Sequence, residues 1–144
     1  MLSKTLSEKM ADFALSLRYE DIPQNVVDAV KLHILDTIGV GLLSVNTSPV
    51  SPVMKKVAND KGVNECTLWG SNNKVSIADA VLCNGTIIHG LDFDDTHTGA
   101  ITHPSASILA TAFAYGEKLS KSGKDIITAA VAGYEVIILS LIHI

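Results

Sequence analysis

Arginine is nearly absent from this 144-residue sequence, in which Arg18 is the only arginine among eleven basic residues. The fifteen acidic residues leave a formal charge of −4, and the lysines are scattered rather than gathered along one stripe. A protein that neutralises phosphates along a nucleic acid needs such a stripe, so nucleic acid is not an expected partner. Few side chains are able to clamp a carboxylate through paired hydrogen bonds.

Cysteine is scarce as well, because the chain contains only Cys66 and Cys83, without CxxC or Cys/His zinc spacing. The first residues lack the basic and apolar regions of a secretory leader, and the two absences together favour a reducing, cytoplasmic compartment. One apolar stretch, residues 126–144, is long enough to cross a bilayer, but Glu135 interrupts it. We interpret it as a buried helix and expect no membrane contact.

Strand-like alternation of apolar and polar residues is almost missing, whereas apolar residues recur at helical spacing through most of the chain. The 47% hydrophobic content suffices for one core. We therefore predict an all-α helical bundle with at most one short strand, at Cys66–Trp69. The predicted helices cover residues 5–18, 23–42, 53–61, 76–91, 104–119 and 124 onward. Gly39 and Gly41 should thin one side of the second helix so that another helix approaches closely.

The segment His89–Ser105 concentrates three carboxylates and three of the five histidines between two predicted helices. One interpretation is a solvated polar loop, which is what most charged clusters are. Solvation alone, however, gives no reason to place three acids at a helix C-terminus, where they oppose the helix dipole. Aspartate and histidine are also the residues that proton abstraction and return require, since their surroundings can tune both toward neutral pH. We favour a functional segment.

His103 precedes Pro104 at a predicted helix start, where the positive end of the helix dipole should keep the imidazole neutral and able to relay a proton. The alternative for His103 is a capping or packed histidine. A second alternative for the whole segment is a metal site, because its acids and histidines are all possible ligands of a divalent ion: Asp92, Asp94, Asp95, His97 and His103. The sequence lacks both a repeated Asp-Asp-x-x-Asp pattern and the spacing of a calcium loop.

Three blocks of the sequence resemble the MmgE/PrpD family, which contains 2-methylcitrate dehydratase and cis-aconitate decarboxylase. Leu35-Asp36-Thr37-Ile38-Gly39-Val40-Gly41 is similar to the family's L-D-x-x-G-x pattern. Trp69-Gly70-Ser71, followed by Asp79-Ala80 and Asn84-Gly85-Thr86, matches the next block. The most specific block is His89–Ser105, which resembles H-x-x-D-F-D-D-T-H…H-P-S.

The resemblance implies that Asp92, Thr96 and His103 line an active site that works without metal or organic cofactor. It implies lyase or isomerase chemistry on small di- or tricarboxylates: dehydration, decarboxylation or epimerisation through an enolate-like intermediate. It further implies a longer chain, expected to be a homodimer, in which later lysines and a tyrosine complete the pocket. Only Lys74 lies near Asp92 in this sequence. We therefore expect the chain alone to bind such a substrate weakly and to be inactive.

The last six residues, Leu139–Ile144, depart from the family pattern, in which a basic residue would normally follow Ile138. Codons for this hexapeptide can match the end of a sequencing-library transposon adapter. We therefore expect residues 1–138 to be part of a helical domain and residues 139–144 to be a non-native tail, and we exclude His143 from any site. The alternatives are a genuine short protein with an apolar tail and a non-catalytic helical module.

Overall fold

The computed structural model describes residues 4–58 and 64–142. Within these residues the chain forms six α-helices, a 3₁₀ turn and one short hairpin. The helices are α1 (Leu6–Ser16), α2 (Gln24–Thr47), α3 (Ser51–Ala58), α4 (Ile77–His89), α5 (Pro104–Lys118) and α6 (Gly123–Ile142), and the 3₁₀ turn is Tyr19–Asp21. The hairpin strands are β1 (Cys66–Thr67) and β2 (Lys74–Val75). The predicted mostly helical fold is confirmed.

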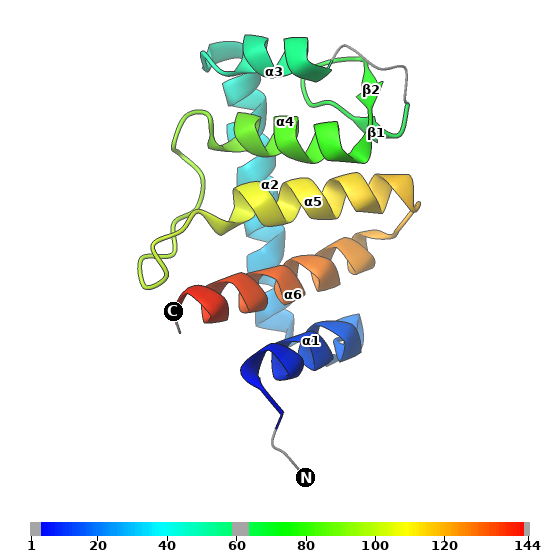
Figure 1. The fold of residues 1–144 in the computed structure, drawn as a ribbon, viewed down its shortest axis with the longest axis vertical. Coiled ribbons are helices and arrows are strands. Elements are labelled where there is room, and N and C mark those ends of the chain that lie inside the picture. Colours follow the sequence, from blue (N-terminus) through cyan, green and yellow to red (C-terminus); the bar gives the residue numbers. More distant parts are fainter. Residues whose placement is uncertain (1–3, 59–63, 143–144) are drawn as a thin grey trace.

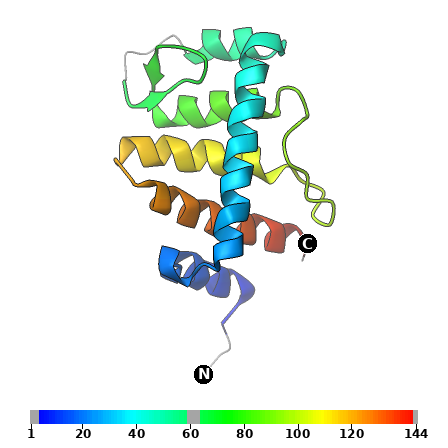
Figure 2. The ribbon, with the colours of Figure 1, turned by 180° about the vertical axis from the view of Figure 1, so that it is seen from behind.

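Five helices lie side by side as the rungs of a ladder, in the order α3, α4, α5, α6 and α1 (Figure 1). The long helix α2 runs across all of them, which is clearest from behind (Figure 2). It contacts α3, α4, α5 and α6 directly. The loop between α4 and α5 emerges from one side of the ladder, where these two rungs end (Figures 1 and 2). The fold therefore presents the segment singled out in the sequence at one edge of the bundle.

The helices begin where local capping signals place them. Thr5 and Glu8 form a capping box at the start of α1, each satisfying a backbone N–H of the other. The Ser76 hydroxyl accepts a hydrogen bond from the Asp79 N–H at the start of α4 (3.1 Å). Pro104 occupies the first position of α5, where a missing N–H costs nothing. The helix starts predicted from these residues are confirmed.

Two hydrophobic clusters fill the interior, and α5 contributes to both. The first packs the hairpin against α2, α4 and α5; its buried members are Val45, Cys66, Leu68, Val75, Ala80, Cys83, Ile87 and Ala114. The second joins α2, α5 and α6; its buried members are Ile22, Val27, Val30, Leu109, Ile127, Ala130 and Val131. Because α5 is packed on both sides, its N-terminus, which follows His103, is held by the whole bundle.

Two local expectations need correction. The second strand, β2, was not predicted, since a two-residue strand carries too short a pattern to recognise. Of the two glycines in α2, only Gly41 permits a close approach: a Cβ there would lie 2.7 Å from the Trp69 ring, whereas Gly39 faces open space. The nearest neighbour of Gly41 is thus an indole ring, and Ile88 of α4 follows at 3.4 Å. The predicted end of the third helix, at residue 61, lies outside the described residues.

Several apolar side chains of α2 and α6 remain in contact with solvent. Leu32, Leu35 and Leu42 of α2 are exposed, and α6 ends with the exposed Leu141 and Ile142. Among the described residues, α6 is the one helix long and apolar enough to cross a membrane. It packs against α1, α2 and α5, but only three of its described residues are buried, so the buried-helix interpretation is correct only for that face.

The two glycines of α2 give a matched test of the packing. Gly41→Ala forces a methyl group against the Trp69 ring and should lower the free energy of unfolding by about 1–3 kcal/mol. Gly39→Ala meets no atom within 4 Å and should raise it by about 0.5–1 kcal/mol, because alanine is the better helix former. Urea unfolding followed by circular dichroism measures both. Equal effects of the two substitutions would contradict the close contact between Gly41 and the Trp69 ring.

Candidate active site

The site begins at the C-terminus of α4, where Gly90 lets the chain leave the helix close to α2. A Cβ on Gly90 would lie 2.7 Å from the hydroxyl oxygens of both Ser44 and Ser48. The Ser48 hydroxyl donates a hydrogen bond to the Gly90 carbonyl (2.8 Å). The loop then turns back through a bridge between His97 and Thr102 and reaches His103, which is the N-cap residue of α5. Both ends of the loop are thus fixed to helices.

Asp94 is the best-enclosed polar group of this loop, because its side chain has no exposure to solvent. Its two carboxylate oxygens lie 3.0 and 3.1 Å from Nδ1 of His89, and one of them lies 3.6 Å from Nδ1 of His103. A carboxylate accepts hydrogen bonds, and a proton on Nδ1 of His89 would be donated to it at these distances. The interpretation of the segment as a solvated loop is therefore wrong for Asp94.

His103 lies at the centre of the predicted catalytic group. Its Nδ1 is 3.5 Å from the Thr96 hydroxyl and 3.4 Å from the Asp94 carbonyl oxygen. Its Nε2 is 3.6 Å from a carboxylate oxygen of Asp92. The structure thus brings Asp92, Thr96 and His103 together, while their catalytic roles stay predictions. The His103 side chain makes no capping hydrogen bond, which removes the capping alternative.

Asp92 occupies an unusual backbone position, with a φ of +57° in the left-handed region. Among residues with a side chain, aspartate and asparagine tolerate this region best. The Asp92 side chain is 76% exposed, so its carboxylate reaches out beside the His103 ring rather than being packed. An asparagine here would keep the backbone geometry and remove only the charge.

A groove of about 750 Å³ opens beside the two histidines. His89 and His103 lie on its wall together with Thr86, Thr102 and the exposed Ile101. Its volume lies within the range of small-molecule pockets. The rings of His89 and His103 are 4.9 Å apart, so both imidazoles are available to one bound molecule.

Asp95, although adjacent to Asp94, points to other partners. One carboxylate oxygen accepts a hydrogen bond from the Ser105 N–H (3.0 Å), and the other lies 3.4 Å from Nδ1 of His33 on α2. The Ser105 hydroxyl is hydrogen-bonded to the Tyr134 hydroxyl on α6. Burial raises the pKa of Tyr134 to about 12, the Ser105 hydrogen bond lowers it and nearby Asp95 raises it.

Sequence reasoning missed His89 and Asp94 as members of the site, and it overvalued His97. His89 is the last residue of α4. Thirteen or more residues separate it in the sequence from Thr102 and His103, so its proximity to them could not be predicted from the sequence. Asp94 was considered only as a possible metal ligand. The His97 ring instead accepts a hydrogen bond from the Ala100 N–H (3.0 Å) and stabilises the turn. The signal available for His89 was its membership of the motif that also contains His103.

Four residues of the site could in principle surround a divalent ion. His89, Asp92, Asp94 and His103 each offer a ligand-type atom, and these atoms lie within 4.8 Å of one another. The ligands of a tetrahedral zinc ion are roughly 3.4 Å apart, so the group would have to contract to bind one. The set differs from the predicted ligands, since Asp95 and His97 are directed elsewhere.

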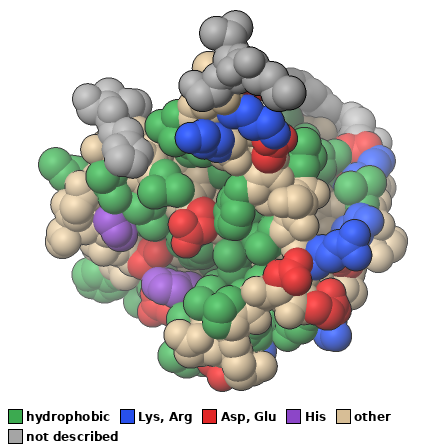
Figure 3. All heavy atoms as spheres, turned by 90° about the horizontal axis from the view of Figure 1, so that it is seen from below, with side chains coloured by type: hydrophobic (Ala, Val, Ile, Leu, Met, Phe, Trp, Pro, Cys, Tyr) green, Lys and Arg blue, Asp and Glu red, His purple; other side chains and the backbone are tan. Residues whose placement is uncertain are grey.

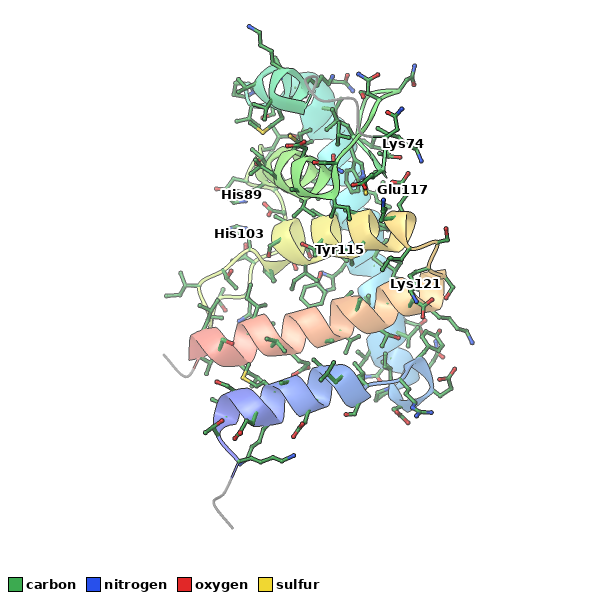
Figure 4. The ribbon with its side chains drawn as sticks, turned by 45° about the vertical axis from the view of Figure 1, so that its right-hand side comes forward. Lys74, His89, His103, Tyr115, Glu117 and Lys121 are labelled. Carbon is green, nitrogen blue, oxygen red and sulfur yellow. The ribbon has the colours of Figure 1, made fainter. Side chains whose placement is uncertain are left out.

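Positive charge is missing from the neighbourhood of these residues. In the described part of the chain, neither lysine nor arginine lines the groove or pairs with Asp92, Asp94 or Asp95. Lys74 is paired with Glu117 (2.8 Å) at the opposite ends of α4 and α5 from His89 and His103 (Figure 4). Seen from below, the visible histidine side chains lie on one side of the molecule with acidic side chains near them, and the basic side chains lie elsewhere, next to other acidic side chains (Figure 3).

Comparison with known proteins identifies the family of this chain. Residues 8–140 match the model of the MmgE/PrpD N-terminal domain. The chain belongs to the MmgE/PrpD family. It is 32% identical over 142 residues to cis-aconitate decarboxylase of Homo sapiens and 30% identical over 141 residues to that of Mus musculus. Cis-aconitate decarboxylase of Aspergillus terreus is 26% identical over 135 residues.

These alignments cover most of this chain but a minor part of each relative. They include 94% of the chain for the two mammalian proteins and 90% for the fungal one. The chain spans 29% of the length of the mammalian relatives and 28% of the fungal one. The resemblance to an N-terminal part of this family is therefore confirmed.

The buried Tyr134 hydroxyl leads to a prediction about alkaline stability. The pKa of the Tyr134 hydroxyl is about 12 in the folded chain and about 10 in an unfolded one. The folded state therefore gains stability from the protonated hydroxyl; this gain is complete below pH 10 and disappears as the pH rises through 12. The expected loss between these values is on the order of 2 kcal/mol. Urea unfolding at pH 9 to 11.5 should show a steeper decline for the wild-type chain than for Tyr134→Phe. Parallel declines would contradict the burial of this hydroxyl.

Proposed function

We propose that this chain forms the helical N-terminal part of a lyase acting on small di- or tricarboxylates, with cis-aconitate as the first substrate to test. The observation that carries the proposal is the position of His103, which lines the groove and has Asp92, Asp94 and Thr96 around its two nitrogens. Three relatives named cis-aconitate decarboxylase support the substrate class. Dehydration or epimerisation of a related acid would use the same groups.

Decarboxylation of such an acid requires a proton donor. Loss of CO₂ leaves an electron pair on carbon, which delocalises into the neighbouring unsaturated carboxylate and must then be protonated at carbon. Dehydration and epimerisation pass through a similar enolate-like species after a proton is removed. A group that both gives and accepts a proton near neutral pH serves all three reactions, and histidine is the usual choice.

The surroundings of His103 suggest which of its protons is exchanged. Oxygen atoms of Asp94 and Thr96 surround Nδ1, so a proton on Nδ1 is held by these neighbours. Nε2 faces Asp92, and a second proton can reside on either of these two groups. We assign proton exchange with the substrate to this His103–Asp92 pair and a hydrogen-bonding role to Thr96. The 3.6 Å separation is long, as is common before a substrate closes the geometry.

Substrate binding needs cations that the described residues do not place near the groove. A tricarboxylate carries up to three negative charges, and the three aspartates of the loop would repel it unless positive groups compensated. We propose that these cations come from other parts of a longer protein. The chain alone is expected to bind substrate weakly and to show no measurable turnover. A homodimeric form of the longer protein is part of the same proposal.

We also propose a cytoplasmic location. Cys66 and Cys83 are both free and buried, and burial raises the pKa of each thiol. Such thiols are unreactive and suit a reducing compartment without requiring one.

A metal-dependent enzyme is the second candidate, favoured by the grouping of His89, Asp92, Asp94 and His103. The two candidates differ in their response to chelation. If the lyase proposal is correct, EDTA treatment and dialysis of an enzyme that contains this domain should leave its turnover of cis-aconitate within about twofold of the untreated value. Loss of activity that zinc or magnesium restores would establish the metal-dependent alternative.

The central test replaces the two proposed proton-transfer groups in such an enzyme. Asp92→Asn preserves size and tolerates the left-handed backbone but removes the charge, so kcat should fall about a hundredfold or more at saturating substrate. His103→Gln should have a similar effect. Thermal unfolding should change little for Asp92→Asn, because this side chain is mostly exposed.

Asp12→Asn is the matched control for these variants. Asp12 is an exposed aspartate of α1 paired with Lys4, remote from the groove. It should leave kcat unchanged. Near-normal turnover of Asp92→Asn would reduce Asp92 to an acidic loop residue and refute its assignment. The same result for His103→Gln would refute the proton-transfer role of His103, whereas a wild-type enzyme that turns over no polycarboxylate would refute the proposed function.

A further inference from the structure

Adjacent carboxylates in the site loop serve two separate sets of partners. The Asp94 side chain turns to His89 and His103, while the Asp95 side chain turns to Ser105 and His33. Asp95 is largely enclosed, with 14% of its side chain exposed. Because the two residues share a peptide bond, a displacement of Asp95 also displaces the backbone of Asp94. The carbonyl of Asp94 is one of the acceptors around Nδ1 of His103.

The contacts of Asp95 form a closed circuit through three helices. Its carboxylate binds the Ser105 N–H at the start of α5 and pairs with His33 of α2. The His33 ring lies against the Tyr134 ring of α6, with centroids 5.6 Å apart. The Tyr134 hydroxyl is hydrogen-bonded to the hydroxyl of Ser105, which closes the circuit. Ser105 is fully buried, so this end of the circuit is fixed inside the bundle.

The position of Ser105 determines what the circuit can control. Ser105 follows His103 by two residues, and the intervening Pro104 has no N–H and a fixed φ angle. The Ser105 N–H is therefore the first backbone donor of α5, and Asp95 accepts its hydrogen bond. The hydrogen bond from the Ser105 N–H to Asp95 therefore fixes the backbone at the start of α5, which carries the His103 ring.

We propose that Asp95 is a positioning residue of the active site, acting together with His33. The pair joins the loop, α2 and the start of α5, and so sets the distance between His103 and its neighbours Asp94 and Thr96. Neither Asp95 nor His33 is assigned contact with the substrate. The inference rests on the proposed function only for its effect on turnover, because the geometry of the His103 ring can be measured without substrate.

The first experiment follows the imidazole resonances of the isotopically labelled chain by NMR, with the His103 signal identified by its loss in His103→Gln. Asp95→Ala should shift the His103 signal and change its dependence on pH, because both contacts of the carboxylate are lost. Asp95→Asn retains an oxygen that can accept the hydrogen bond from the Ser105 N–H, so it should shift the His103 signal less. His33→Gln leaves the Asp95–Ser105 hydrogen bond intact and should shift the His103 signal in the same direction as Asp95→Asn.

Asp125→Asn is the matched control, since Asp125 also accepts a hydrogen bond from a backbone N–H at a helix start, that of Ser122 before α6. Lys121, beside that start, lies on the opposite side of the fold from His103 (Figure 4). The control should leave the His103 signal unchanged, even where it loses similar stability. An unchanged His103 signal in His33→Gln and in a folded Asp95→Ala would overturn the proposal. If Asp95→Ala does not fold, His33→Gln alone decides, because its side chain is half exposed.

The second experiment measures turnover in an enzyme that contains this domain. Asp95→Ala should lower kcat about ten- to a hundredfold, as expected when a reacting group is displaced rather than removed, with a KM within about threefold. Asp95→Asn should recover part of this loss, and Asp125→Asn should have no effect. A loss of kcat that Asp95→Asn does not relieve would contradict positioning through Ser105. If the wild-type enzyme turns over no polycarboxylate, the proposed function fails, and the NMR result still decides the role of Asp95.

Discussion

Asp94 carries a carboxylate enclosed by protein, and its side-chain neighbours are the imidazoles of His89 and His103. Transferring a carboxylate out of water costs several kcal/mol unless polar partners compensate it. The partners here come from the last residue of α4 and the residue before α5. The loop can therefore adopt this conformation only when these two helix ends are side by side. The short distance between the two histidines follows, because both contact the same carboxylate.

The bundle gives this contact its rigidity. The two hydrophobic clusters share α5, which packs against α4 on one side and α6 on the other. The α2 helix crosses behind them and contributes Val27 and Val30 to one cluster and Val45 to the other (Figure 2). The start of α5 is consequently held in position by its packing against α2, α4 and α6. The chemistry proposed for the site depends on this arrangement, because proton transfer is sensitive to small displacements.

The helical fold was predictable because its signals are local. Thr5, Ser76 and Pro104 mark helix starts through contacts within a few residues, and the apolar spacing between them defines the rest. The site was predictable only in part. Asp92, Thr96 and His103 were identified by resemblance to a family, and the structure places them together.

The remaining features depend on contacts between distant residues. The pairing of Lys74 with Glu117 and of His33 with Asp95 brings together residues more than forty positions apart. Adjacent Asp94 and Asp95 look equivalent in the sequence, yet they face different helices because of the backbone path of the loop. Gly39 and Gly41 look equally suited to close packing, yet only one of them faces the interior. No local pattern distinguishes the members of these pairs.

The contact between Gly41 and Trp69 also gives the molecule an internal optical reporter. Trp69 is the sole tryptophan of the sequence, and its ring lies against α2 and edge-on to Phe113 of α5, with centroids 5.9 Å apart. The Trp69 backbone is hydrogen-bonded to the side chain of Asn84 on α4. Its emission therefore comes from a place where the hairpin loop meets α2, α4 and α5. Fluorescence from this chain reports the docking of the hairpin onto the bundle, separately from the total helix content that circular dichroism records.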